Sequence, residues 1–199
     1  MNLPTKLTVL RIILTFVMIA FLIFPFHTIG INFPSYNVDG VSQAIDLRVI
    51  LAGVFFVIAS LTDFLDGYLA RKNNQVTDRG KMLDAIADKI LVNSALIILA
   101  WKGFIPVIIP VLIVMRDTIV DVIKMEAGNK GKVVAAIKSG KIKTACMMIG
   151  LTLVFIYNLP FEIWNIHLGL FLVYFATLMS VISGIQYWRL NKSIIITDE

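Results

Sequence analysis

The stretch DFLDGYLARKNNQVTDRGKMLDAIADK, residues 63–89, places four aspartates inside a chain that is otherwise strongly apolar. Hydrophobic residues make up 58% of the 199 residues and charged residues only 16%, and the mean hydropathy is +0.87. A soluble domain of this size could not bury so much apolar surface, whereas runs of about 20 apolar residues match a hydrocarbon core about 30 Å thick. The composition therefore predicts an all-α integral membrane protein.

Hydropathy predicts six transmembrane helices in a single domain that covers residues 1–199. The first span contains Arg11 and is followed by no small-residue cleavage site, so we interpret it as a mature helix and not as a signal peptide. A polar loop at 26–47 has room for a short surface helix. The predicted spans cover about residues 7–25, 48–70, 83–101, 104–124, 143–160 and 165–188.

The basic residues predict how the chain is oriented in the membrane. If the N-terminus is cytoplasmic, the basic loops all fall on the cytoplasmic side, and only Arg48 and Lys102 fall on the opposite side. The net charge of +5 then lies mainly near anionic lipid headgroups. Because these residues form short juxtamembrane loops and no continuous stripe, we expect no nucleic-acid binding. We predict a multi-pass membrane protein with both termini in the cytoplasm.

The aspartates need compensation, since each ionised carboxylate at a helix centre costs about 2.5–3.5 kcal/mol. Asp63 and Asp66 share one helix face, as do Asp84 and Asp88, and the short polar loop between the pairs makes the two helices antiparallel neighbours. Four converging carboxylates form an all-oxygen site for hard cations such as Mg²⁺, Mn²⁺ or Ca²⁺, with room for two ions. The alternative is simple pairing with nearby basic residues: Arg71, Lys72, Arg79, Lys81 and Lys89.

Small residues and one arginine accompany the aspartates. Gly67 and Ala70 leave room for a bulky group against the helix, and Gly80 lets the chain approach a ligand closely. Arg71 offers a forked, permanently charged donor that suits a diphosphate. The polar stretch therefore predicts a phosphate-handling site at the cytoplasmic face.

Written as spacing, the stretch is D-x2-D-G-x2-A-R-x8-G-x3-D-x3-D, running from Asp63 to Asp88. It resembles the defining motif of the CDP-alcohol phosphotransferases, membrane enzymes of phospholipid synthesis, and every motif position is filled. The segments NLPTKLTVLR (residues 2–11) and GKIKT (residues 140–144) resemble the phosphatidylglycerophosphate synthase branch. Two positions depart from the pattern: Ala85 stands where the family often has proline, and Asp117 where this branch often has glutamate.

The resemblance implies a cytoplasm-facing polar cavity with a di-metal site, in a homodimer of the bacterial cytoplasmic membrane. It implies transfer of the phosphatidyl group of CDP-diacylglycerol to glycerol-3-phosphate, giving phosphatidylglycerophosphate and CMP. Two divalent cations, Mg²⁺ or Mn²⁺, would be held by Asp63, Asp66, Asp84 and Asp88, with Asp88 also acting as the general base on the acceptor hydroxyl. The residues implied to bind the nucleotide part of CDP-diacylglycerol are Asn2, Thr5, Gly67, Ala70, Arg71, Thr77 and Gly80.

The acceptor half of the predicted site rests on basic residues. Arg116 lies in the apolar span VLIVMRDTIVDVIKM, residues 111–125, which makes it a functional hypothesis by default. Arg116 together with three lysines would suit the phosphate of glycerol-3-phosphate. The alternatives are an Arg116–Asp pair that only joins helices, and lysines that only set topology. The three lysines are Lys138, Lys141 and Lys143.

Other readings remain open. The aspartate motif does not separate glycerol-3-phosphate from serine, inositol phosphate or a lipid as the acceptor. The His-x-Lys class of phosphatidyltransferases is excluded, because neither His27 nor His167 is followed by lysine two positions on. A cation transporter is the alternative from another class, but the sequence has none of the inverted repeats that such proteins usually carry.

Overall fold

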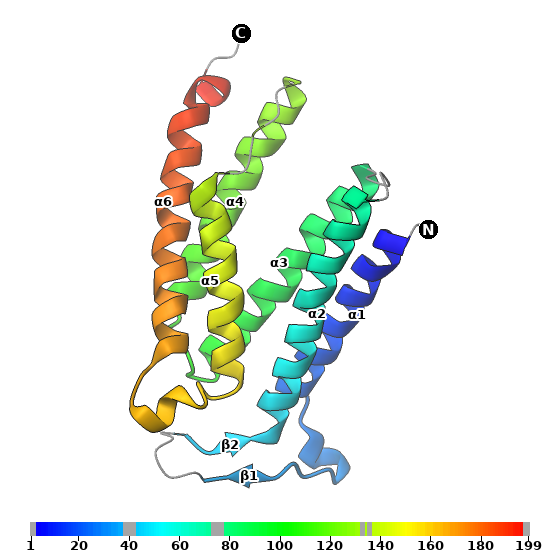
Figure 1. The fold of residues 1–199 in the computed structure, drawn as a ribbon, viewed down its shortest axis with the longest axis vertical. Helices are drawn as coiled ribbons and strands as arrows, with labels where there is room; N and C mark the ends of the chain where they lie inside the picture. Colours follow the sequence, from blue (N-terminus) through cyan, green and yellow to red (C-terminus); the bar gives the residue numbers. More distant parts are fainter. Residues whose placement is uncertain (1–2, 38–42, 73–77, 132–133, 135–136, 197–199) are drawn as a thin grey trace.

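The computed structural model is almost entirely helical, and the described residues form six α-helices (Figure 1). It describes residues 3–37, 43–72, 78–131, 134 and 137–196; the side chains of residues 3–4, 64, 66–72, 78–79, 81 and 193–196 lie outside the description. Each of the six helices overlaps one of the six predicted spans, with different ends. The elements are α1 (Leu3–Ile23), η1 (Phe26–Ile29), β1 (Ser35–Tyr36), β2 (Ile45–Asp46), α2 (Leu47–Lys72), α3 (Asp78–Trp101), α4 (Ile108–Asn129), α5 (Lys138–Phe155), η2 (Phe161–Trp164) and α6 (Leu168–Ile196).

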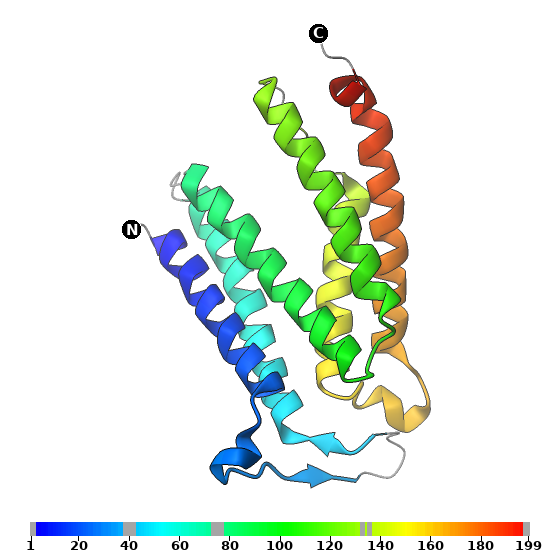
Figure 2. The same ribbon diagram turned by 180° about the vertical axis from the view of Figure 1, so that it is seen from behind.

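The helices form two groups of three, which we call the N-terminal half (α1–α3) and the C-terminal half (α4–α6). Helix α1 packs along α2 and α3, while α6 packs along α4 and α5; α2 with α5 and α3 with α4 join the halves. Figures 1 and 2 show the halves close together at the end that carries η1, η2 and the strands, and diverging toward the other end. The start of α1 and the end of α6 both lie at this diverging end, which we call the open end.

Local backbone geometry explains where the helices differ from the predicted spans. Helix α5 ends at Phe155, before the predicted 160, because Tyr157 and Asn158 both adopt a φ of 56°, which a helix cannot continue. Gly103, with a φ of 82°, makes the turn after α3, so that α4 begins at Ile108. At the open end α4, α5 and α6 run past the apolar spans into polar sequence.

The buried core lies where the two halves meet. Phe56 of α2 and Phe155 of α5 are fully buried, and their ring centroids lie 5.3 Å apart. Gly53 allows this approach, since a Cβ added there would lie only 2.6 Å from the Cβ of Phe155. Close helix contact at a small residue is the usual packing device of helices in lipid.

Large apolar side chains also cover the outside of the helices, including Ile13, Leu61 and Phe171, which are all more than half exposed. By length and composition, two segments of the described helices can cross a membrane: Thr5–Ile23 and Leu168–Lys192. An apolar exterior of this kind is what lipid favours and water does not. These features indicate a membrane protein.

The end opposite the open end carries the short surface helix expected in this loop, η1, and also a short antiparallel strand pair. Strands β1 and β2 pair Ser35 with Asp46. The Asp46 backbone N–H donates to the Tyr157 hydroxyl at 2.7 Å, and the Asp46 carboxylate accepts from Arg48 Nη2 at 2.6 Å. Partial burial raises the pKa of Asp46, but the hydrogen bonds from Arg48 outweigh it, so the pKa lies below its usual range. This pair stabilises the entry into α2.

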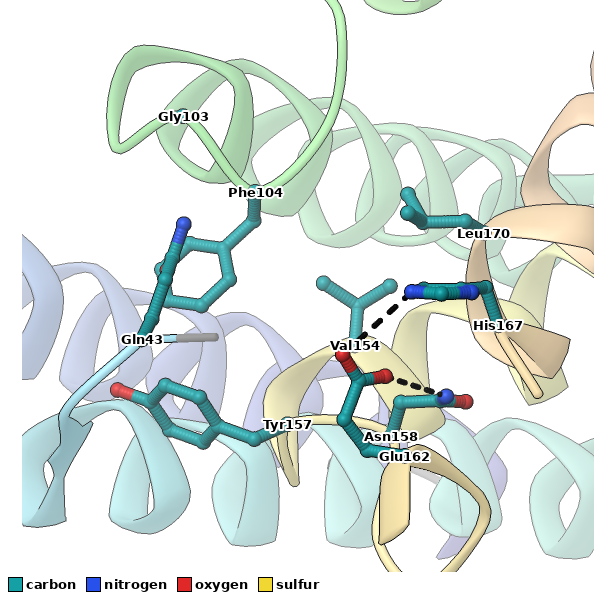
Figure 3. A pocket seen from close by; sticks show the side chains of 9 residues that line it. All are labelled: Gln43, Gly103, Phe104, Val154, Tyr157, Asn158, Glu162, His167 and Leu170. Carbon is teal, nitrogen blue, oxygen red and sulfur yellow. Dashed lines mark hydrogen bonds and ion pairs between the residues drawn. The ribbon is translucent and has the colours of Figure 1, made fainter. Parts of the chain in front are cut away.

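A cavity of about 250 Å³ lies at the same end (Figure 3). Phe104, Tyr157 and His167 are among its lining residues. Asn158 Nδ2 donates to Glu162 Oε2 at 2.9 Å, and His167 Nε2 lies 3.6 Å from Glu162 Oε1. These contacts tie η2 to the flanking helices, and the residues that line the cavity include none of the predicted site residues.

Candidate functional site

The acidic part of the site lies where α1, α2 and α3 pack together. Arg11 of α1 is fully buried, and its Nη1 lies 2.7 Å from Asp63 Oδ1 and 2.8 Å from Asp84 Oδ1. Asp63 comes from α2 and Asp84 from α3, and their side chains remain 38% and 46% exposed. One guanidinium nitrogen therefore holds carboxylates from two helices while both stay accessible to a ligand.

Asp88 lies one turn after Asp84 on α3 and faces the boundary between the two halves. It is within electrostatic range of Asp63, Asp84, Arg11 and Lys143. A cavity of about 30 Å³ lies beside it, which is space for a hydroxyl group or a water molecule. The residues that line this cavity are Asp88, Lys89, Val92, Asn93, Asp117, Lys143, Thr144 and Met147.

The acidic side chains fit hard divalent cations in chemical type. Asp63 and Asp84 lie within hydrogen-bonding reach of each other, Asp88 is close by, and carboxylate oxygens are the donors that Mg²⁺ and Mn²⁺ prefer. Among the described residues no three His, Cys, Asp or Glu side chains are arranged as a ready-made metal cage. The side chain of Asp66, the fourth predicted ligand, lies outside the description. In this arrangement Arg11 occupies the side of Asp63 and Asp84 where their oxygens converge.

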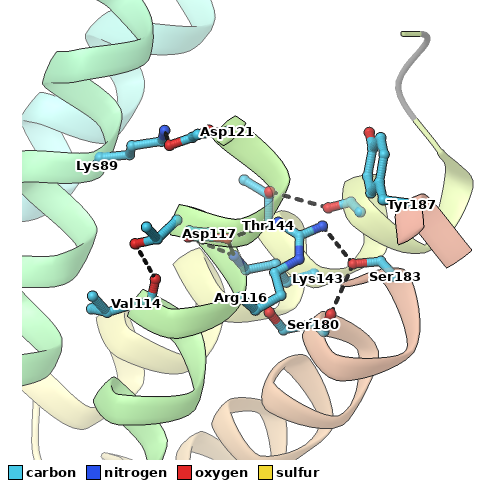
Figure 4. Close-up of polar contacts among 12 residues, drawn as sticks. Lys89, Val114, Arg116, Asp117, Asp121, Lys143, Thr144, Ser180, Ser183 and Tyr187 are labelled. Carbon is cyan, nitrogen blue, oxygen red and sulfur yellow. Dashed lines mark hydrogen bonds and ion pairs between the residues drawn. The ribbon is translucent and has the colours of Figure 1, made fainter. Parts of the chain in front are cut away.

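The basic part of the site joins α4, α5 and α6 (Figure 4). Arg116 of α4 donates from Nη1 to Asp117 Oδ1 at 2.7 Å and from Nη2 to Ser183 Oγ of α6 at 2.6 Å. Lys143 of α5 donates to both oxygens of Asp117, at 2.7 and 2.9 Å. The side chains of Arg116 and Lys143 are only 13% and 10% exposed. Two cations therefore share the single carboxylate of Asp117.

Helix α6 shapes the surroundings of Arg116. A Cβ added at Gly184 would lie 2.9 Å from Arg116 Cγ, so only glycine lets the arginine stem lie against α6 here. The ring of Tyr187 lies 5.6 Å from Arg116 Cζ, a cation–π distance. Ser183, Gly184 and Tyr187 follow one another along the same stretch of α6, so this helix fixes the position of the guanidinium.

The structure separates the four residues predicted to bind the acceptor phosphate. Arg116 and Lys143 meet at Asp117, whereas Lys138 and Lys141 are exposed at the start of α5 and lie outside this cluster. Spacing alone could not separate them, because all three lysines lie in one short basic stretch.

Among the residues predicted to bind the nucleotide, Thr5 and Gly80 are described. They lie in the first turns of α1 and α3, at the open end, and both are partly buried. Gly67 lies in α2. Asn2 and Thr77 lie outside the described residues. Ala70 and Arg71 lie in α2, but their side chains are outside the description.

The sequence reasoning missed two side chains of the site. Arg11 is visible in the sequence as a charge inside the first span, but nothing in the sequence predicts its contact with Asp63 and Asp84. A lone charge in an apolar helix is itself a signal that a partner exists. Ser183 lies in the last span among apolar and aromatic residues, and no local pattern marked it as a partner of Arg116.

The two parts of the site carry opposite excess charge. Among the described side chains of the acidic part, two carboxylates, Asp63 and Asp84, contact one cation, Arg11. In the C-terminal half two cations, Arg116 and Lys143, share one carboxylate, Asp117. The first arrangement attracts added cations and the second attracts an added anion. Asp88 lies between them.

Known proteins were compared with this chain. The family model of CDP-alcohol phosphatidyltransferase matches residues 1–185. A Bacillus subtilis protein named CDP-diacylglycerol–glycerol-3-phosphate 3-phosphatidyltransferase is 35% identical over 190 residues, covering 96% of this chain and 95% of its own. A Rickettsia bellii protein of the same name is 33% identical over 192 residues, covering 96% of each chain.

A solved structure agrees in fold. The apo crystal structure of Mycobacterium tuberculosis phosphatidylinositol phosphate synthase matches with a TM-score of 0.59, covering 98% of this chain and 94% of that one, at 20% sequence identity. This likeness concerns the fold alone. The family model and the relatives, which span nearly the whole chain, settle the classification. The chain belongs to the CDP-alcohol phosphatidyltransferase family.

Proposed function

We propose that this protein transfers the phosphatidyl group of CDP-diacylglycerol to glycerol-3-phosphate, giving phosphatidylglycerophosphate and CMP. The names of the relatives support this donor and this acceptor. The observation that carries the proposal is the opposite charge excess of the two clusters, Asp63 and Asp84 with Arg11 and Asp117 with Arg116 and Lys143, with Asp88 between them. A lipid diphosphate bound through cations and a phosphorylated acceptor need just such a pair of neighbouring sites.

The acidic part would hold two divalent cations, Mg²⁺ or Mn²⁺, through Asp63, Asp66, Asp84 and Asp88. Bound there, the cations supply charge neutralisation for the diphosphate and for the leaving CMP. Arg71 would offer a forked donor to the oxygens of the diphosphate. The nucleotide would lie against the open end of α1–α3, at Asn2, Thr5, Gly67, Ala70, Thr77 and Gly80.

Asp88 would act as the general base. Its carboxylate takes the proton of the acceptor hydroxyl, whose oxygen forms a bond to the phosphorus that carries the diacylglycerol. The bond from that phosphorus to the oxygen shared with the cytidylate breaks, and CMP leaves with the electron pair. The cavity of about 30 Å³ beside Asp88 gives the acceptor hydroxyl a place to approach.

Arg116 and Lys143 would bind the acceptor phosphate. An arginine has five N–H donors and a lysine three, so both can contact a phosphate while they keep Asp117 as a partner. Lys143 lines the same cavity as Asp88, which supports an acceptor bound with its phosphate at Lys143 and its reacting hydroxyl near Asp88. Lys138 and Lys141, exposed at the start of α5, would attract the anion toward this position.

The membrane arrangement follows from the same charges. The six helices would be six crossings, with both termini and the active site on the cytoplasmic side of a bacterial cytoplasmic membrane. The support is that the start of α3, the end of α4 and the start of α5, which are rich in basic residues, lie at the open end, whereas the start of α2, with Arg48, and the end of α3, next to Lys102, lie at the opposite end (Figure 1). The acyl chains of the donor would lie in the surrounding lipid. A homodimer is the assembly that the family resemblance suggests.

The test is CMP release by purified protein in detergent with CDP-diacylglycerol and Mg²⁺ or Mn²⁺. Parallel reactions contain glycerol-3-phosphate, serine, inositol phosphate or no acceptor, and the lipid product is identified by mass. We expect cation-dependent CMP release with glycerol-3-phosphate alone. Release with another acceptor would overturn the assignment of Arg116 and Lys143, and no release from folded protein would overturn the enzyme assignment.

A further inference from the structure

Arg11 is the residue whose position is least explained by the proposed reaction. It lies within α1, it is fully buried, and its Nη1 contacts the Oδ1 atoms of both Asp63 and Asp84. The same two carboxylates are the proposed ligands of the divalent cations. The positively charged guanidinium of Arg11 is therefore ion-paired with the same oxygen atoms that a divalent cation would approach.

Two effects follow from this contact. Without a cation, Asp63 and Asp84 are like charges held within reach of each other, and Arg11 offsets their repulsion. With a cation present, the positive guanidinium beside the ligand oxygens repels it and competes for their lone pairs. The first effect stabilises the cation-free protein, and the second weakens cation binding.

We propose that Arg11 is a positioning residue that replaces a divalent cation between Asp63 and Asp84. It keeps the two carboxylates together and offsets part of their charge when the site is free of cations, and it limits how tightly the site binds them. This inference rests on the proposed function, because it takes Asp63 and Asp84 to be cation ligands.

The test measures Mn²⁺ binding and thermal unfolding of the full chain in detergent, with and without a chelator. Arg11→Met removes the charge at similar length, and Arg11→Lys keeps the charge. Arg48→Met is the matched control, because Arg48 also pairs with an aspartate, Asp46, but at the opposite end of α2.

We expect Arg11→Met to bind Mn²⁺ at least about tenfold more tightly than the wild type, since a cationic competitor is gone. Its unfolding temperature should fall in chelator and be raised by Mn²⁺ more than that of the wild type. Arg11→Lys should bind Mn²⁺ within about threefold of the wild type, because its charge is retained. Arg48→Met should lower the unfolding temperature equally with and without Mn²⁺.

Three results would overturn the inference. If Arg11→Met binds Mn²⁺ no more tightly than the wild type, Arg11 does not compete with the cation, and the proposed function stands. If Arg11→Met does not fold, the test rests on Arg11→Lys. A tenfold difference between its Mn²⁺ affinity and that of the wild type would then contradict the inference that the charge of residue 11 sets the affinity. If the wild type binds no Mn²⁺, the cation site of the proposed function fails, and the inference fails with it.

Discussion

The N-terminal and C-terminal halves each contain a cluster of charged side chains, and the two clusters differ in their ratio of cations to carboxylates. In α1–α3 a buried arginine is shared by two carboxylates, whereas in α4–α6 a buried carboxylate is shared by an arginine and a lysine. Charges inside an apolar helical bundle need partners, and neither of these two clusters provides them in equal number among the described side chains. The cluster at Arg11 therefore has an excess of one negative charge, and the cluster at Asp117 has an excess of one positive charge.

This difference would let one small fold bind two substrates of like charge. A diphosphate and a phosphate repel each other, so a uniformly basic pocket would not distinguish them. Asp63 and Asp84 of the N-terminal half would bind the diphosphate through cations. Arg116 and Lys143 of the C-terminal half would bind the acceptor phosphate directly.

Asp88→Asn should have the largest effect. The amide cannot accept the hydroxyl proton, so we expect CMP release to fall by about 10²- to 10⁴-fold. Folding and binding of CDP-diacylglycerol should be retained, and both can be measured on the same preparation. An Asp88→Asn protein with full activity would contradict the general-base assignment.

Lys143→Met should act on the acceptor alone. Loss of a charged hydrogen-bond donor corresponds to a rise in KM for glycerol-3-phosphate of roughly 10- to 100-fold. The KM for CDP-diacylglycerol should not change, because Lys143 lies in the C-terminal half, whereas the proposed donor site lies in the N-terminal half. Lys102→Met, at the opposite end of the molecule, is the control. Equal changes in both KM values would mean that the halves do not divide the substrates.

Gly184→Val should disturb Arg116 through packing. The new side chain would meet the arginine stem, since a Cβ at this position lies 2.9 Å from Arg116 Cγ. Overpacking typically costs 1–3 kcal/mol, and we expect a rise of about tenfold in KM for glycerol-3-phosphate. Gly128→Val is the matched control on α4, where an added Cβ meets nothing within 4 Å. A Gly184→Val enzyme with an unchanged acceptor KM would show that the position of Arg116 is not important.

Lys138→Ala and Lys141→Ala should have the smallest effects. Both side chains are exposed and lie outside the Asp117 cluster, so each change should raise the acceptor KM by no more than about threefold. The effect should disappear at high salt, which screens exposed charges. KM values measured across a salt series test this, and a loss as large as that of Lys143→Met would place these lysines in the site.

Local patterns in the sequence were enough to predict much of this arrangement. Apolar runs predicted six helices, and the spacing of Asp63, Asp84 and Asp88 predicted that they would lie together at one end. Both predictions depend on periodicity within a helix or on a short loop between two helices. Such interactions are visible in a single stretch of sequence.

The remaining parts of the site depend on contacts between helices distant in sequence. Arg11 reaches Asp84 across 73 positions, and Ser183 reaches Arg116 across 67, so neither pairing has a local signature. The same applies to the separation of Lys143 from Lys138 and Lys141, which the direction of each side chain on α5 decides. The β1–β2 pair was missed because two-residue strands are too short to produce an alternating pattern.

The most direct test of the division between the halves is a crossed binding measurement. Mn²⁺ and glycerol-3-phosphate binding would be measured on two variants, an Asp63→Asn and Asp84→Asn double variant and Lys143→Met. We predict that the double variant loses Mn²⁺ binding and keeps the acceptor, and that Lys143→Met keeps Mn²⁺ and binds the acceptor at least tenfold more weakly. If either variant loses both ligands while folded, or keeps both at wild-type affinity, the two halves are not the separate sites described here.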